Sequence, residues 1–214
     1  MPRGNSPRRQ EMMKEVIANK QFDLAVILEN VHDTHNIGAV LRTSESIGIQ
    51  EVFILYTEEH LYKKNLKLGK RTSSGSRKWL DVYLFDDLED CVKAVRSKYD
   101  RLIGTILNKN ARSLYDLDLT GSAAFVFGNE KKGISSELAA HLDENFIIPQ
   151  VGFVKSLNIS VACAVSLYEA MRQRVAGGYY YNDFDPSDPD QKELFKNYTE
   201  RAQKKGYGNK PIIT

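Results

Sequence analysis

Short apolar runs alternate along the chain with segments of helical spacing. Residues 22–28 are too apolar for a strand with one exposed face, which is typical of a central parallel strand. Apolar residues then recur every three to four positions over 37–47, which predicts a helix that Gly48 ends. A second strand is expected at 51–56. Strand, helix and strand with short connections predict a βαβ unit.

The same alternation continues through the rest of the chain. Further strands are predicted at 81–85, 101–107 and 123–127, and one more that ends at residues 147–149. Helices are predicted at 7–19, 86–98, 136–142 and 189–205, and the last nine residues as a frayed tail. Residues 57–79 are expected to form a long basic loop. The pattern favours an α/β fold with a mostly parallel sheet and helices on both faces.

Residues 147–174 combine a strand end, a polar loop and a helix. Pro149 ends the strand, because it has no N–H to donate to a sheet ladder. Ser156 and Asn158 are good N-cap residues, and the helix that follows is apolar nearly all round over 159–165, which predicts burial. Two interpretations stay open for the loop: N–H groups that face a ligand, or an ordinary strand, loop and capped helix.

A glycine-flanked loop, GNEKKG, follows the strand at 123–127. Its spacing matches the G-x-x-x-x-G of a phosphate-binding loop, but Ile134 stands where the phosphate-binding lysine is needed, which excludes an NTPase. No G-x-G-x-x-G follows the first strand, so the pattern does not favour a dinucleotide-binding fold. The loop, which carries Glu130, still suits close approach of its backbone to a small ligand.

Composition narrows the class of protein. With 214 residues, 42% of them hydrophobic, the chain is long enough for one domain with a sizeable core. Cys91 and Cys163 lie far apart, so neither a disulfide framework nor a cysteine zinc site is expected, and a cytoplasmic location is the prediction. His32 and His35 lack a third ligand nearby, so no metal is expected. No apolar run is long enough for a membrane span or a signal peptide.

The positive charge gathers in three segments. Net charge is +2, but residues 1–20 carry +3, residues 60–80 carry +7 and residues 191–214 carry +4, which leaves −12 on the rest. Basic segments on an acidic body predict a polyanionic partner, with RNA first among candidates, whereas solvated surface lysines are the alternative. The predicted RNA-binding residues are Arg8, Arg9, Lys63, Lys64, Lys70, Arg71, Arg77, Lys204 and Lys205.

Three separated motifs together resemble a known family. They are NVHDTHNIGAVLRTSESIG at 30–48, FVFGNEKKGIS at 125–135 and IPQVGFVKSLNISVACAVSLYEAMRQR at 148–174. They resemble the SPOUT methyltransferases, in the SpoU/TrmH branch of RNA ribose 2′-O-methyltransferases, over residues 22–180. Gln150 is a departure, because that family usually has methionine after Ile-Pro.

The resemblance implies an architecture and an activity. It implies a SPOUT-like catalytic domain at 22–178 with a deep C-terminal trefoil knot, a basic helical extension at 1–21, and a linker with a basic helical extension at 179–214. It also implies a homodimer, an S-adenosylmethionine pocket in the knot, and methyl transfer to a ribose 2′-OH of tRNA, with guanosine 18 of the D-loop as the expected target. No DNA partner is expected. Another tRNA or rRNA site, a non-catalytic RNA-binding relative and a nucleotide-binding protein unrelated to RNA stay open as alternatives.

The resemblance also assigns roles to residues. Arg42 matches the catalytic arginine, and we expect it to stabilise negative charge on the 2′-oxygen, because a guanidinium pKa above about 12 makes it a poor base. Asn36 and Ser156 are expected to orient Arg42, Glu130 matches the acid of the second motif, and Asn158 pairs with Ser156 in the third. The residues expected to hold the cofactor are Leu107, Gly128, Gly133, Ile148 and Leu157.

Overall fold

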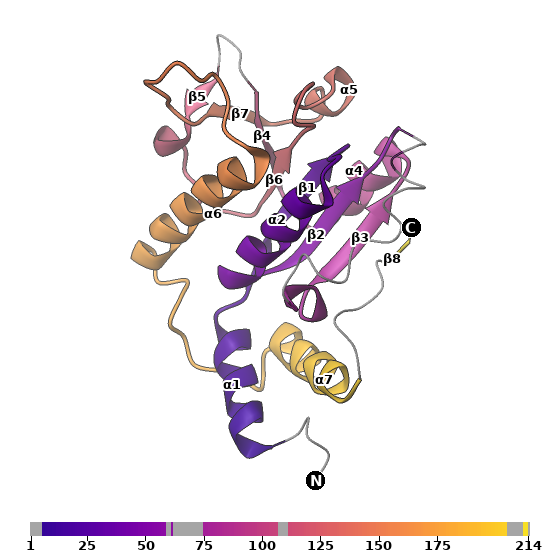
Figure 1. The fold of residues 1–214 in the computed structure, drawn as a ribbon. Coiled ribbons are helices and arrows are strands. Elements are labelled where there is room, and N and C mark those ends of the chain that lie inside the picture. The colour runs from indigo at the N-terminus through magenta and orange to yellow at the C-terminus, as the bar shows by residue number, and fades with distance from the viewer. Residues whose placement is uncertain (1–5, 59–60, 62–74, 107–110, 205–211, 214) are drawn as a thin grey trace.

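The computed structural model of the chain describes residues 6–58, 61, 75–106, 111–204 and 212–213 (Figure 1). At its centre lies an eight-stranded sheet, ordered β5-β7-β4-β6-β1-β2-β3-β8, in which neighbouring strands pair in parallel. The strands are β1 (Gln21–Glu29), β2 (Ile49–Leu55), β3 (Asp81–Phe85), β4 (Arg101–Thr105), β5 (Arg112–Ser113), β6 (Ala123–Phe127), β7 (Glu144–Ile147) and β8 (Ile212–Ile213).

Helices cover both faces of this sheet, as the sequence predicts (Figure 1). They are α1 (Pro7–Ala18), α2 (Thr34–Ser46), α4 (Leu88–Arg96), α5 (Ser136–Ala139), α6 (Ile159–Ala176) and α7 (Pro189–Gln203), with the 3₁₀ helices η1 (Ser76–Lys78) and η2 (Leu114–Asp116). Among the described residues, no helix is both long enough and apolar enough to cross a membrane.

The two cores follow from the alternation of side chains along β1. Because successive residues of a strand point to opposite faces, Leu24 and Val26 pack with α2 and α6, whereas Ala25 and Ile27 pack with α4 and α5. Burial on both faces explains why this strand is apolar almost throughout. A third, smaller cluster joins α1 to α7 at one end of the molecule.

The strands at 81–85 and 123–127 have the predicted boundaries, whereas other elements differ. The predicted helix at 136–142 is shorter, because only Ser136–Ala139 is α-helical. The tail predicted to fray instead contributes Ile212 and Ile213, which pair with Tyr83 and Leu84 at the sheet edge. A two-residue strand has no periodicity of its own, so this pairing depends on an edge that the local sequence does not reveal.

Helix α6 is buried on one side only, in contrast to the predicted burial of 159–165 all round. Ile159 and Cys163 are buried in the core, but Val161 is 46% exposed and Tyr168 is 52% exposed. Apolar residues therefore lie on all sides of α6, but only those on one side pack into the core. The outer apolar side remains available for contact with another molecule.

Arg174, near the end of α6, is completely buried. Its guanidinium donates to both carboxylate oxygens of Asp23 at 2.8 Å and to Gln21 Oε1 at 2.9 Å, and it also donates to the carbonyls of Leu119 and Gly121. These hydrogen bonds clamp the end of α6 to the beginning of β1.

Candidate functional site

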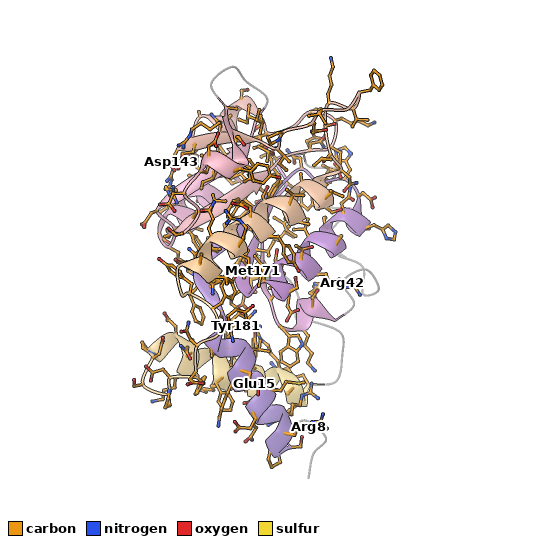
Figure 2. The ribbon with its side chains drawn as sticks, turned by 90° about the vertical axis from the view of Figure 1, so that its left-hand side faces the viewer. Arg8, Glu15, Arg42, Asp143, Met171 and Tyr181 are labelled. Carbon is orange, nitrogen blue, oxygen red and sulfur yellow. The ribbon has the colours of Figure 1, made fainter. Side chains whose placement is uncertain are left out.

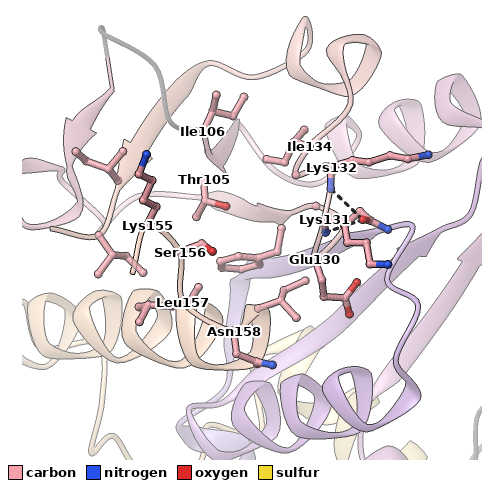
Figure 3. A pocket seen from close by; sticks show the side chains of 18 of the residues that line it. Thr105, Ile106, Glu130, Lys131, Lys132, Ile134, Lys155, Ser156, Leu157 and Asn158 are labelled. Carbon is pink, nitrogen blue, oxygen red and sulfur yellow. Dashed lines mark hydrogen bonds between the residues drawn. The ribbon is translucent and has the colours of Figure 1, made fainter. Parts of the chain in front are cut away.

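A cavity of about 660 Å³ opens at the carboxyl ends of β4, β6 and β7 (Figure 3). Its walls are residues 105–106 at the end of β4, 127–134 after β6, 146–148 at the end of β7 and 155–159 at the start of α6. In open parallel sheets ligands bind at this edge, and the volume lies within the roughly 300–1,000 Å³ of small-molecule sites.

Most residues predicted for the site line this cavity. Those that do are Gly128, Glu130, Gly133, Ile148, Ser156, Leu157 and Asn158. Leu107, predicted to hold the cofactor, lies outside the described residues. Asn36 and Arg42, both on α2, are not among the lining residues.

A chain of hydrogen bonds joins the three sequence motifs at the rim of the cavity. Asn36 Nδ2 donates to Glu130 Oε1 at 3.0 Å, and Asn158 Nδ2 donates to Asn36 Oδ1 at 3.1 Å. The backbone N–H of His32 points to the other oxygen of Glu130 at 3.4 Å. Because an ionised carboxylate only accepts hydrogen bonds, Glu130 fixes which end of the Asn36 amide faces Asn158.

Asn158 connects this chain to the beginning of α6. Its Oδ1 accepts from Ser160 N at 2.8 Å and from Ser160 Oγ at 2.6 Å, so Asn158 is the N-cap of the helix, as its position in the sequence predicted. With Oδ1 occupied by the cap, its Nδ2 is directed to Asn36. The capping geometry of α6 therefore positions a side chain of the site.

The glycine-flanked loop folds back on itself. Asn129 and Gly133 exchange backbone hydrogen bonds of 2.9 and 2.8 Å, and Asn129 Oδ1 accepts from the N–H groups of Lys131 and Lys132. A Cβ atom at Gly128 would lie 2.1 Å from the carbonyl carbon of Gly133. Gly128 is therefore needed for the loop to close, which in turn holds Glu130 at its tip.

Asn30 and Asn129, which were not among the residues predicted for the site, join three strand ends. Asn129 Nδ2 donates to the carbonyl of Asn30 at 2.7 Å, and Asn30 has a left-handed backbone with φ 49°. The Asn30 side chain also exchanges hydrogen bonds of 2.8 and 3.0 Å with Thr57. An asparagine directly after a buried strand was the available signal, because asparagine tolerates this backbone conformation better than most residues.

A buried carboxylate holds the far end of the same loop. Glu29, only 1% exposed at the end of β1, accepts from Ser135 N at 2.8 Å and from Ser135 Oγ. Burial raises the pKa of Glu29, and the two hydrogen bonds from Ser135 oppose that rise. Ser135 is also the N-cap of α5. The segment with Glu130 is thus anchored to β1 at both ends, through Asn30 and Glu29.

Arg42 lies on a different side of α2 from Asn36. Six residues separate them, which corresponds to about 240° around the helix and about 9 Å along its axis. The Arg42 side chain is exposed, and Figure 2 shows it on the flank of α2. Within one chain the partners of the Asn36 amide are Glu130 and Asn158, so its expected role in orienting Arg42 stays a prediction.

The loop before α6 presents apolar side chains to solvent. Val151 and Phe153 are fully exposed, with relative areas of 106% and 107%.

Among the described residues, no group of three or more His, Cys, Asp or Glu side chains is arranged to hold a metal ion.

The chain is similar in sequence and in fold to known proteins. Residues 23–168 match the SpoU rRNA Methylase family. The chain is 37% identical over 178 residues to the tRNA (guanosine(18)-2′-O)-methyltransferase of Thermus thermophilus, which covers 83% of this chain and 89% of that protein.

Two solved structures resemble the fold. The TrmH/SpoU tRNA modifying enzyme of A. aeolicus superposes with a TM-score of 0.80 at 28% identity, over 92% of this chain and 98% of that chain. The SpoU methyltransferase AviRb from Streptomyces viridochromogenes, solved in complex with the cofactor AdoMet, has a TM-score of 0.62 at 26% identity, over 73% and 60% of the two chains.

Proposed function

The chain belongs to the SpoU rRNA Methylase family, and we propose that it transfers a methyl group from S-adenosylmethionine to the ribose 2′-hydroxyl of guanosine 18 in tRNA. The observation that carries the proposal is the chain of hydrogen bonds Glu130–Asn36–Asn158, which brings three separated motifs to the rim of one cavity. The T. thermophilus relative supports the choice of nucleotide, because its name states this activity.

The cavity suits S-adenosylmethionine. Ile106, Ile148 and Leu157 offer apolar surface for an adenine ring, while Glu130 and Asn158 supply polar groups at one side (Figure 3). AviRb, of similar fold, was solved with this cofactor. When bound, the cofactor supplies a methyl group on a reactive sulfonium, so no metal is required for the transfer.

The protein contributes to the reaction by positioning the ribose hydroxyl and by stabilising the negative charge that develops on it. A ribose hydroxyl is a weak nucleophile, so it must be held in line with the methyl group while its proton leaves. We assign Arg42 to the acceptor, where its guanidinium contacts the 2′-oxygen or its phosphate and stabilises the developing negative charge. The proton passes to a phosphate or to water. We keep Ser156 and Asn36 in the role of orienting Arg42.

We propose that the active form is a homodimer. Val151 and Phe153 on the loop and Val161 and Tyr168 on α6 form two exposed apolar regions that adjoin in sequence. Exposed apolar side chains concentrated on neighbouring segments are typical of an interface rather than of a free surface. The dimer would bury the side of α6 that the sheet leaves uncovered.

The same proposal includes the domain boundaries and the trefoil knot. The sheet order β5-β7-β4 supports a knot, because the later strand β7 inserts between two earlier ones before the chain continues into α6. We assign residues 22–178 to the catalytic domain and residues 1–21 and 179–214 to helical extensions that bind RNA. A cytoplasmic location follows from tRNA as the substrate.

The test compares two tRNA transcripts that differ only at position 18. With guanosine 18, the purified protein and S-adenosylmethionine should produce one 2′-O-methyl group per tRNA. A transcript that already carries 2′-O-methylguanosine at this position should accept none. Equal incorporation into both transcripts would overturn the choice of nucleotide, and no incorporation into either would overturn the activity.

A further inference from the structure

A second cavity, of about 580 Å³, lies at the end of the molecule where α1 meets α7. Its walls come from four segments that are far apart in the sequence, and Trp79, the only tryptophan of the chain, is one of them. We call it the Trp79 cleft. Its lining side chains are Ser6, Arg8, Arg9, Met12, Met13, Val16, Glu45, Trp79 and Tyr198.

Positive charge surrounds the indole ring of Trp79. The guanidinium carbon of Arg9 lies 5.9 Å from the ring centroid, and Lys78 Nζ lies 5.6 Å from it. No ion pair joins Arg8, Arg9 or Lys78 to a carboxylate among the described residues. Glu45 is the one acid in the described lining. Arg8, Arg9 and Lys78 therefore outnumber this one acid.

The floor of the cleft is apolar and open to solvent. Met12 and Val16 of α1 are exposed, and Met13 is buried beneath them. The Trp79 ring packs against the tilted ring of Tyr198, with ring centroids 5.0 Å apart. An apolar and aromatic floor with a cationic rim matches the chemistry of a nucleotide, whose base stacks on aromatic rings while its phosphate binds arginine and lysine.

The cleft also lies on the side of α2 that carries the predicted catalytic arginine. Glu45 follows Arg42 by three residues, so the two share one face of the helix about 4.5 Å apart along its axis (Figure 2 shows Arg42 on α2). RNA bound at Arg42 would therefore lie on the same side of α2 as Glu45, which lines the Trp79 cleft. We propose that the Trp79 cleft binds an unpaired nucleotide of the RNA substrate, with the base against Trp79 and the phosphate held by Arg8, Arg9 and Lys78. This inference rests on the proposed function.

The single tryptophan makes the proposal directly measurable. The full-length protein is titrated with tRNA while its emission is excited at the red edge of the absorption band, so that the 11 tyrosines do not contribute. Free tryptophan amide corrects for absorption by the RNA. A base stacked on Trp79 should quench the emission along the same saturation curve as binding followed by filter retention. Emission that stays unchanged while the RNA binds would overturn the proposal.

Two comparisons separate stacking from mere charge attraction. A short single-stranded RNA should quench Trp79, whereas an abasic oligonucleotide of equal length should bind through its phosphates and quench much less. Equal quenching by both would contradict the stacked base.

Arg8→Glu should weaken tRNA binding by about tenfold. Lys93→Glu on α4, which also reverses the charge of one exposed basic side chain, should change tRNA binding by less than about twofold. Equal effects of the two variants would also contradict the proposal.

Failure of the proposed function has a different signature. If tRNA quenches Trp79 but no methyl group is transferred, the nucleotide site stands and the methyltransferase activity does not. If methyl transfer to guanosine 18 proceeds with unchanged emission, the activity stands and the Trp79 cleft is not an RNA site.

Discussion

Asn36 Nδ2 donates a 3.0 Å hydrogen bond to Glu130 Oε1, although 94 residues separate the two in the sequence. The bond ties the first turn of α2 to the tip of the loop after β6. Asn158, from the beginning of α6, completes the chain through Asn36 Oδ1. Each of the three side chains belongs to a different sequence motif, so the fold itself assembles the site from distant parts of the chain.

Loss of the Asn36 amide should impair transfer without unfolding the protein. Asn36→Ala removes the two hydrogen bonds that join Glu130 to Asn158, so kcat should fall by about 10²-fold, similar to the loss of a positioned polar group in other active sites. The melting temperature should change little, because these hydrogen bonds lie near solvent. Ser46→Ala at the other end of α2 is the control. Steady-state kinetics in which both variants match the wild type would exclude the role.

The closed loop should depend on Gly128. In Gly128→Ala the new Cβ would meet Gly133 at 2.1 Å, so the loop must open and the cavity wall must move. Cofactor affinity measured by calorimetry should fall by about tenfold or more, since forced backbone shifts cost about 1–3 kcal/mol. Gly121→Ala is a matched control, because its Cβ would make an ordinary 3.4 Å contact with Arg101. Wild-type affinity in Gly128→Ala would show that the loop does not shape the cofactor site.

The buried clamp of Arg174 should dominate the stability of α6. Arg174→Met leaves two carbonyls and the half-exposed Asp23 carboxylate without their donor, so the free energy of unfolding should fall by about 1–3 kcal/mol. Arg172→Met, which removes the exposed partner of Glu169, should have a smaller effect, because Glu169 keeps its hydrogen bond from Gln173 Nε2. Urea unfolding measures both variants. A similar loss of unfolding free energy in the two variants would mean that the burial of Arg174 does not increase its contribution to stability.

The buried Lys20 should make the free energy of unfolding depend on pH in the alkaline range. Burial lowers the pKa of Lys20 to about 8, against the attraction of Glu45 and Asp81, whereas the unfolded value is 10.5. Between these two values the unfolded chain binds the extra proton, so folding becomes more favourable as pH rises through this window. Relative to Lys20→Met, the wild type should gain up to about 3 kcal/mol between pH 8 and pH 10.5. A constant difference across the window would contradict this account.

The sequence predicted the central strands well and the contacts of the site poorly, for physical reasons. β6 is buried at all five positions and β3 at three of its five, so a short apolar run marks each strand in the sequence. The bond between Glu29 and Ser135 spans 106 residues, and no local pattern reports a contact of that range. Apolar residues on all sides of α6 indicated burial, but periodicity does not distinguish the sheet from a second molecule as the partner.

The central claim is methyl transfer to the 2′-hydroxyl of guanosine 18, and mapping of 2′-O-methyl groups tests it most directly. Total tRNA and rRNA from cells that lack this protein are mapped before and after incubation with S-adenosylmethionine and the purified protein. One new 2′-O-methyl group should appear, at guanosine 18 of tRNA. Arg42→Ala should restore none of it while binding the cofactor with nearly unchanged affinity. A new methyl group at an rRNA site, or one produced equally by Arg42→Ala, would contradict the account.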